Sequence, residues 1–203
     1  MPFEVAKLDR IRSAAGYLTI AETLALADNG NVVLDPFSLL IGRGIHIGKN
    51  NVFFPNVSLS CEHAGSVTVG DGNTFFPGVS LLATHGPIVI GNGNQFGEGG
   101  FTAKANRSGA FIEIGDRGRY LGGAAVYGAT ELGSGSQILG AISADNCTLG
   151  PGAPHTDPNP DERGAVMKGA GTARDLTVAR GMTLAGNGTF SAADAKPQSF
   201  YHK

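Results

Sequence analysis

The sequence predicts an all-β fold, a single-stranded parallel β-helix with three hexapeptide strands in each coil. Mostly apolar side chains recur at six-residue intervals, and glycine follows the first of them in each block. A hexapeptide period is typical of a triangular parallel β-helix, in which every repeat supplies one short strand. The anchors of five successive blocks are Ile47, Phe53 and Leu59; Val69, Phe75 and Leu81; Ile90, Phe96 and Thr102; Ile114, Tyr120 and Val126; and Leu132, Ile138 and Ala144.

The six-residue count fails in three consecutive blocks, always after the third anchor. The chain has four additional residues after Leu59, three after Leu81 and six after Thr102. Because all three insertions follow the same anchor, we expect them to protrude as loops from one corner of the triangle. Insertions in solenoids collect on one face, which is frequently the binding face.

This pattern divides the chain into three parts. We expect residues 1–33 to cap one end of the coil, residues 34–190 to form the β-helix, and residues 191–203 to form a C-terminal tail. The stretch 150–165 is rich in proline and aspartate and has no apolar period, so it is predicted to leave the coil as a loop. The six-residue count then resumes at Val166, Thr172, Val178, Leu184 and Phe190.

A short helix is expected before the coil begins. Thr19 and Glu22 have the spacing of a capping box, and Asn29-Gly30 is a typical helix stop. These signals predict a helix over residues 20–28. Such a helix would cover strand edges that the open end of the coil otherwise exposes.

Composition disfavours several classes of protein. The formal net charge is −2, which argues against a nucleic-acid groove or an anionic membrane as partner. No apolar run approaches the roughly 20 residues of a membrane span, and residues 1–12 lack the apolar core of a signal peptide. We therefore expect a cytoplasmic protein. Cys61 and Cys147 lie four coils apart, about 19 Å at the usual strand spacing, so both thiols should be free.

Two further series of side chains are expected to be structural. Aromatic second anchors should point inward and stack in a single column, because they recur one coil apart. These residues are Phe53, Phe75, Phe96 and Tyr120. Asn51, Asn73 and Asn94 recur at one corner, where asparagine tolerates turn geometry and its amide can bond along a ladder.

The Ile-Gly-x-x-Asn pattern followed by six-spaced aliphatic residues resembles the hexapeptide-repeat (isoleucine-patch) superfamily. That resemblance implies a left-handed coil, and an enzyme of this superfamily is typically a trimer with active sites between adjacent prisms. Its members are mostly acyltransferases that use acetyl-CoA or acyl carrier protein, and they include γ-carbonic anhydrases and dynactin subunits. The segments 83–94 and 178–188 are similar to stretches of the pointed-end dynactin subunits, which are not catalytic. The Gly-His-x-x-x-x-His-Gly stretch of the γ-carbonic anhydrases is absent.

Three of the five histidines are expected near the corner that carries the insertions. His63 and His85 each follow a third anchor by four residues, and His46 approaches the same corner one coil earlier. In one interpretation His85 or His63 is the general base of an acyltransferase, with Glu62 as an orienting carboxylate. In another, His46, His63 and His85 bind a metal ion such as Zn²⁺. In the third, they are ordinary polar loop residues.

A CoA thioester would need cations near the same corner. Lys104 and Arg107 of the third insertion are the candidates for its phosphates, and Arg163 and Lys168 are alternatives beside the 150–165 loop. The leading expectation is a homotrimeric acyltransferase with acetyl-CoA or another acyl-CoA as cosubstrate and no metal. It would transfer an acyl group to a small hydroxyl- or amine-bearing acceptor. The alternatives are a non-catalytic scaffold similar to the dynactin subunits and a metal-dependent enzyme of the carbonic-anhydrase type.

Overall fold

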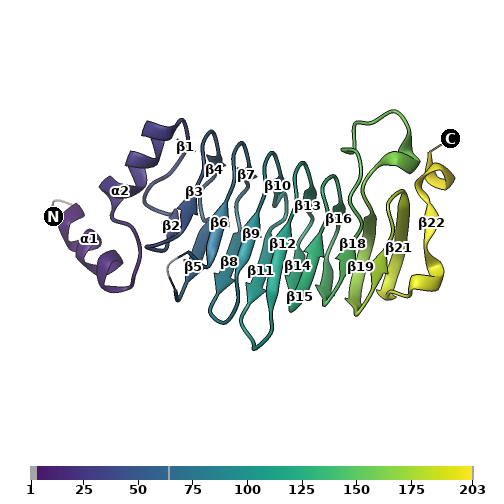
Figure 1. The fold of residues 1–203 in the computed structure, drawn as a ribbon. Helices are drawn as coiled ribbons and strands as arrows, with labels where there is room; N and C mark the ends of the chain where they lie inside the picture. Colours follow the sequence, from purple (N-terminus) through teal and green to yellow (C-terminus); the bar gives the residue numbers. More distant parts are fainter. Residues whose placement is uncertain (1–3, 64, 203) are drawn as a thin grey trace.

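The computed structural model describes residues 4–63 and 65–202 and shows a left-handed parallel β-helix (Figure 1). The coils stack along one axis, so that each strand pairs in parallel with strands of the neighbouring coils. We call the sides that carry the first, second and third anchors the first, second and third sides of the triangle. The predicted fold class is confirmed.

The first side is a seven-stranded parallel sheet. Its strands are β3 (His46–Ile47), β6 (Val67–Val69), β9 (Ile88–Ile90), β12 (Phe111–Ile114), β15 (Ala129–Leu132), β18 (Thr148–Leu149) and β20 (Thr177–Val178). The second side begins with β1 (Val32–Val33), β4 (Val52–Phe53), β7 (Thr74–Phe75), β10 (Gln95–Phe96), β13 (Arg119–Leu121) and β16 (Gln137–Leu139).

The third side begins with six strands in the same way. They are β2 (Leu40–Ile41), β5 (Ser58–Cys61), β8 (Val79–Ala83), β11 (Phe101–Ala105), β14 (Ala124–Tyr127) and β17 (Ile142–Asp145). Two long strands, β19 (Val166–Arg174) and β21 (Met182–Thr189), turn the corner between the second and third sides. They join these two sides into one fifteen-stranded sheet.

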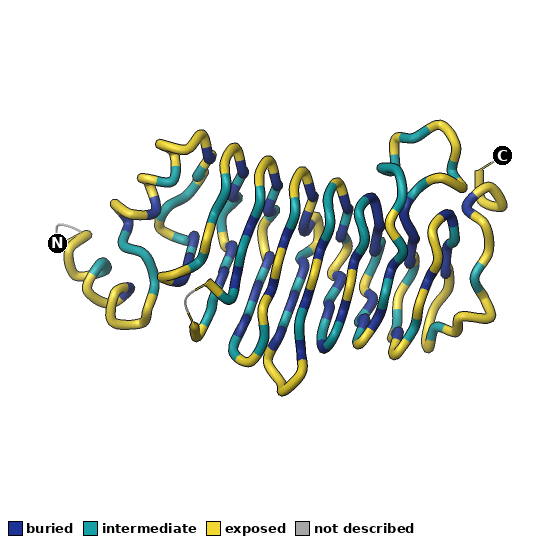
Figure 2. The backbone as a smooth tube through the Cα atoms, viewed as in Figure 1, coloured by how far each residue is buried: buried dark blue, intermediate teal, exposed yellow. Residues whose placement is uncertain are grey.

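The interior holds one column of aromatic rings, as the repeat predicts. Phe53, Phe75, Phe96 and Tyr120 are fully buried. Consecutive ring centroids are 5.0, 5.1 and 5.4 Å apart, close to the spacing between strands. Buried and less buried residues alternate along the strands (Figure 2), because successive side chains point to opposite faces of a sheet. The predicted register is therefore confirmed at these four positions.

A ladder of buried asparagine side chains occupies one corner, also as predicted. The backbone N–H groups of Asn51, Asn73 and Asn94 each donate to the Oδ1 atom of the asparagine one coil earlier, at 2.8 to 2.9 Å. Asn31 is the first acceptor of this series. Each Nδ2 group also donates to a glycine carbonyl of the next coil. The ladder thus ties each coil that carries one of these three asparagines to the two beside it.

The third block departs from the predicted count. Ala103 faces inward instead of Thr102, because Ala103 pairs with the inward residues Leu81 and Val126. One additional residue lies in the preceding corner, 97–100, whose three glycines have φ values of 106°, 101° and 90°. Only glycine adopts such angles readily, so this corner widens by one residue while the strands on both sides stay in register.

Directly after the 150–165 loop, the inward-facing positions are also shifted by one residue from those predicted. Met167 and Ala173 face inward in place of the predicted Val166 and Thr172, since both pair with inward residues of the preceding coil. Val166 is buried nevertheless, because the loop and the C-terminal tail cover the outer face of the sheet here. Apolar character alone could not distinguish Val166 from Met167 as the anchor. Val178 faces inward as predicted.

Helices cover the N-terminal end of the coil. They are α1 (Val5–Ala14), α2 (Ile20–Leu24) and the 3₁₀ helix η1 (Ala25–Asn29). The capping box between Thr19 and Glu22 is present, and the helix expected over residues 20–28 is α-helical in its first half and 3₁₀ in its second. The sequence holds no comparable signal for α1, which was not predicted.

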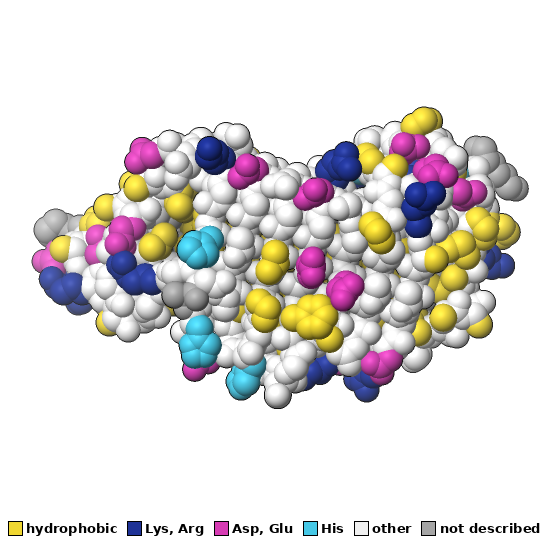
Figure 3. All heavy atoms as spheres, viewed as in Figure 1, with side chains coloured by type: hydrophobic (Ala, Val, Ile, Leu, Met, Phe, Trp, Pro, Cys, Tyr) yellow, Lys and Arg dark blue, Asp and Glu magenta, His cyan; other side chains and the backbone are white. Residues whose placement is uncertain are grey.

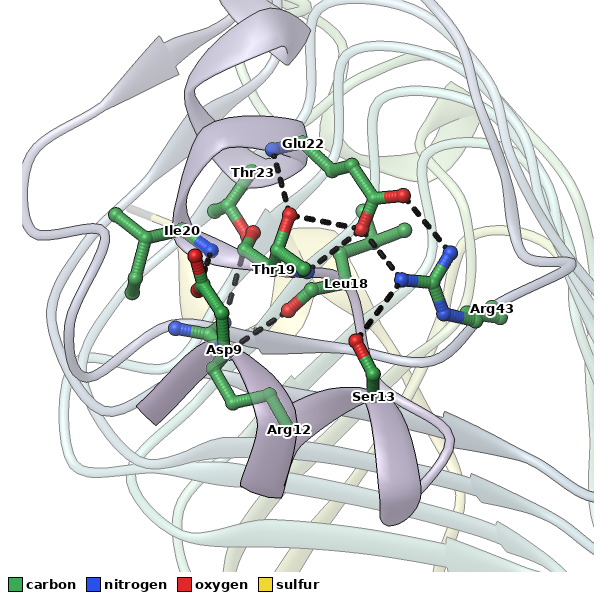
Figure 4. A network of polar contacts seen from close by, with 9 residues as sticks. All are labelled: Asp9, Arg12, Ser13, Leu18, Thr19, Ile20, Glu22, Thr23 and Arg43. Carbon is green, nitrogen blue, oxygen red and sulfur yellow. Dashed lines mark hydrogen bonds and ion pairs between the residues drawn. The ribbon is translucent and has the colours of Figure 1, made fainter. Parts of the chain in front are cut away.

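The side chain of Arg12 attaches α1 to the coil. It is 3% exposed, and its donors reach backbone carbonyls of two later segments. The acceptors are the carbonyls of Leu18, Pro36 and Leu39. Burial lowers the pKa of this guanidinium, and the carboxylate of Asp9 opposes that shift. Figure 4 shows Asp9 accepting from the backbone N–H of Ile20, so the same network also fixes the start of α2.

The C-terminal tail folds back over the last coil. It contains η3 (Ala192–Asp194), β22 (Lys196–Pro197) and η4 (Gln198–Tyr201). β22 pairs with β21 in antiparallel fashion, the reverse of every other strand pairing in the described coil. The 150–165 loop, which contains η2 (Pro160–Glu162), projects from the coil beside this tail (Figure 1).

Cys61 and Cys147 are both free thiols, as predicted. Burial is the largest contribution that raises the pKa of each of these thiols. Among the described residues, no helix combines the length and the apolar character needed to cross a membrane.

The aromatic column gives a direct test of register. Phe75→Ala removes a fully buried ring and should lower the free energy of unfolding by about 3–5 kcal/mol. Phe76 is the matched control, because it stacks on Phe54 on the outer face and is only partly buried. Phe76→Ala should cost distinctly less in urea unfolding. Equal losses would contradict the register described here.

A second test concerns pH. Hydrogen bonds from Arg43 and from the Thr19 backbone lower the pKa of Glu22 from 4.5 to about 2. A lowered folded-state pKa stabilises the protein above pH 4.5, and that contribution is lost as the pH falls toward about 2. The difference in melting temperature between wild type and Glu22→Gln should therefore be present at neutral pH and vanish near pH 2.

Glu113→Gln on the exposed surface of β12 provides the control for this pH series. A wild-type advantage over Glu22→Gln that persists unchanged at pH 2 would show that the carboxylate charge is not its source.

Candidate functional site

Three consecutive loops protrude where the third side passes into the first. Their described residues are 62–63 with 65–66, 84–87, and 106–110, and they lie along one edge of the coil (Figure 1). In the next coil a single residue, Gly128, separates β14 from β15. The predicted gathering of insertions at one corner is confirmed, and it creates the most irregular surface of the central coils.

His63 and His85 lie together at this edge. Both are exposed, and both line a shallow pocket of about 170 Å³ whose other walls include Ser66 and Pro87. Ser66 donates from its hydroxyl to the backbone carbonyl of His63 at 2.7 Å, which holds that loop closed. Figure 3 shows histidine side chains gathered over the N-terminal half of the molecule.

The backbone around His85 is firmly positioned. The N–H groups of Thr84, His85 and Gly86 all donate to the carbonyl of Ala105, at 3.2, 3.0 and 3.2 Å. A Cβ atom on Gly86 would lie 1.6 Å from the carbonyl oxygen of Ala110, so only glycine allows the two neighbouring loops to approach this closely. The loop that carries His85 is thereby fixed against the next coil.

One nitrogen of the His85 ring has a partner and the other is open. Nδ1 lies 3.1 Å from the Thr84 hydroxyl, and Nε2 has no hydrogen bond within the described residues. When Nδ1 carries the proton and donates to Thr84, Nε2 keeps an open lone pair. This is the tautomer that a general base requires.

His46, the third histidine predicted for this corner, does not line the pocket. It lies in β3, on the outer face of the first side, and pairs with Thr68. Its Nε2 atom lies against the loop at Gly65, 3.6 Å from where a Cβ atom of that residue would be. Throughout residues 4–63 and 65–202, no three His, Cys, Asp or Glu side chains are placed to share a metal ion.

The other predicted site residues are nearby but differently engaged. Glu62 is exposed, and its carboxylate has no hydrogen bond to either histidine of the pocket. Lys104 points outward from β11, level with Leu82 and Tyr127. Arg107 reaches across Gly128 to form an ion pair with Asp145, which raises the pKa of its guanidinium. Its charge is therefore largely balanced within the chain.

Two larger concavities lie outside this corner. A groove of about 540 Å³ on the third side is lined by Tyr127, Asp145 and Arg174, but Asp145 is already paired with arginine side chains. A pocket of about 300 Å³ on the second side is lined by Arg163 and Lys168, the alternative cations of the sequence, together with Arg119, which the sequence did not single out.

No family model matches the chain, and no curated protein matches it in sequence. The resemblance to hexapeptide-repeat proteins therefore rests on the repeat residues, and the function has to be argued from the geometry of the corner.

The arrangement predicts weak affinity for metal ions at the histidine corner. Protein prepared without a histidine tag or chelator should contain far less than one zinc ion per chain by elemental analysis, because two exposed imidazoles make an incomplete ligand set. Stoichiometric zinc that disappears in the His63→Ala/His85→Ala double variant would instead support the metal-dependent alternative.

Proposed function

We propose that the protein is a hexapeptide-repeat acyltransferase that transfers an acyl group from an acetyl-CoA-type thioester to a small hydroxyl- or amine-bearing acceptor. The observation that carries this proposal is the pocket shared by His63 and His85 at the corner where the loops gather. Acyl transfer needs a base with an open lone pair on a fixed backbone, and His85 has both features. No metal ion is required.

The chemistry follows from the Nε2 atom of His85. Its lone pair removes the proton from the acceptor hydroxyl or amine, and the freed oxygen or nitrogen attacks the carbonyl carbon of the thioester. As the carbon–sulfur bond breaks, the imidazolium returns the proton to the CoA sulfur. In this proposal His63, which lines the same pocket, binds the acceptor. Lys104 remains the proposed contact for the donor phosphates.

The proposal includes a cytoplasmic homotrimer, in which a second prism closes the shallow pocket of about 170 Å³. A pocket of this size is below the range of about 300–1,000 Å³ that usually holds small molecules, so one prism alone provides an incomplete site. Sedimentation should then give about three times the chain mass of 20.7 kDa. A stable monomer would remove the closing surface and contradict this part of the proposal.

Histidine variants test the chemical step. His85→Ala should lower turnover about 10²–10⁴-fold, the usual contribution of general acid–base catalysis, while acetyl-CoA affinity changes little. His46→Ala is the matched control, since His46 is exposed but lies outside the pocket. Release of free CoA thiol can be followed over a panel of small alcohols and amines. Activity that survives loss of both His63 and His85 would refute the assignment.

One observation favours a different function, a non-catalytic scaffold. Large exposed apolar side chains concentrate in the N-terminal cap and the first coil. These are Val5, Ile11, Leu24, Val32, Leu34 and Phe37. Exposed apolar clusters often mark protein interfaces. If calorimetry detects no binding of acetyl-CoA to the wild type, assembly through this end becomes the better explanation of the fold.

A further inference from the structure

The pocket of about 300 Å³ on the second side is a built cavity near the C-terminal end of the coil. Its floor is a row of outward side chains on neighbouring strands, where Arg119 pairs in register with Gln137, and Val166 with Thr183. The 150–165 loop and the C-terminal tail form its walls. Segments from four separate regions of the chain therefore converge on one site.

The pocket is strongly cationic. Arg119, Arg163 and Lys168 line it, and no aspartate or glutamate does. Acidic residues of the adjacent loop are engaged elsewhere, since Asp161 accepts from the backbone of Ser199 and Glu162 pairs with Arg180. Three uncompensated positive charges thus face one cavity in a chain whose formal net charge is −2.

Two donors in the pocket lack a partner. The Nε atom of Arg119 and the Nδ1 atom of His155 are buried without a hydrogen bond among the described residues. Gln137 and Thr183, each only 6% exposed, add polar side chains to the lining of the cavity. Buried polar groups are almost always hydrogen-bonded in folded proteins, so these groups point to a ligand rich in acceptors.

The two arginines of the pocket have no carboxylate partner among the described residues. Arg163 donates to the backbone carbonyl of Asp157 and, at 3.4 Å, to Nε2 of His202. Guanidinium groups with no carboxylate partner match the geometry of phosphate oxygens, which accept several hydrogen bonds at once. Burial, followed by the charges of Arg119 and Arg163, also lowers the pKa of His155, as expected where positive charge accumulates.

We propose that this pocket binds the phosphate group of a small phosphomonoester. Its volume of about 300 Å³ is larger than a free phosphate ion needs, and the apolar side chains of Val166 and Leu139 in its lining can contact the organic part. The pocket lies on a different side of the triangle from the histidine corner. The inference therefore does not rest on the proposed acyl transfer.

Calorimetry with defined probes tests the proposal. At low salt, inorganic phosphate and ribose 5-phosphate should both bind, the latter with a dissociation constant of about 1 mM or below, and ribose should not. Arg119→Gln and Lys168→Gln should each weaken binding about 10–100-fold, the usual worth of a charged hydrogen bond. Lys168 is exposed, so its replacement tests the site without disturbing the sheet.

Arg117→Gln is the matched control, because it removes the same charge from the same coil but from an exposed residue outside the pocket. The Arg117→Gln and His85→Ala variants should both bind the two phosphate probes with the wild-type affinity. Failure of both phosphate probes to bind, or binding that is unchanged in Arg119→Gln and Lys168→Gln, would overturn the proposal. Tighter binding of CoA than of dephospho-CoA, lost in Arg119→Gln, would identify the thioester donor as the source of the phosphate.

Discussion

The rest of this structure depends on the vertical register between coils. A parallel ladder by itself tolerates slippage, but the asparagine ladder admits one alignment, because each amide both accepts from one coil and donates to the other. A one-residue slip of any coil within the ladder would leave buried amide groups unpaired, at a cost of about 1–3 kcal/mol for each. The aromatic column reinforces the same alignment, since its rings stack only when the coils are in step.

The ladder ends where the core changes. Gly118 donates its backbone N–H to Asn94, but a Cβ atom on Gly118 would lie 2.2 Å from the Tyr120 hydroxyl. That hydroxyl forms a hydrogen bond with the Ser136 side chain at 3.0 Å, and burial in the dry interior raises the pKa of Tyr120. Gly118 thus stands at the corner position that asparagine occupies in the earlier coils. The Tyr120 hydroxyl takes the space that an asparagine side chain would fill.

Both ends of the coil are closed by elements with no repeat of their own. At the N-terminal end the buried guanidinium of Arg12 donates to carbonyls that have no preceding coil to bond to. At the other end β22 pairs with β21 in antiparallel fashion and ends the parallel ladder. The two concavities with chemical character also lie where the repeat is interrupted, one at the corner loops and one beneath the 150–165 loop. Regular coils present flat faces, so a pocket requires an irregularity.

The sequence by itself determined the parts of this protein that repeat. An anchor every six residues reports a local geometry that is the same in each coil, so the fold, the aromatic column, the asparagine ladder and the corner of the insertions could all be predicted. The same reasoning was wrong by one residue at Thr102 and Val166. There a glycine-rich corner or a covering loop changed the count without changing the apolar character of the chain.

Only the tertiary structure decided which side chains meet. His46 does not line the pocket of His63 and His85, and it lies within a strand instead of a loop, a difference that spacing does not reveal. The cationic pocket depends on where a loop and a tail settle on the coil, and it brings Arg119 and Arg163 together across more than 40 residues of chain. Such contacts arise from long-range packing of unique segments, and no local period encodes them.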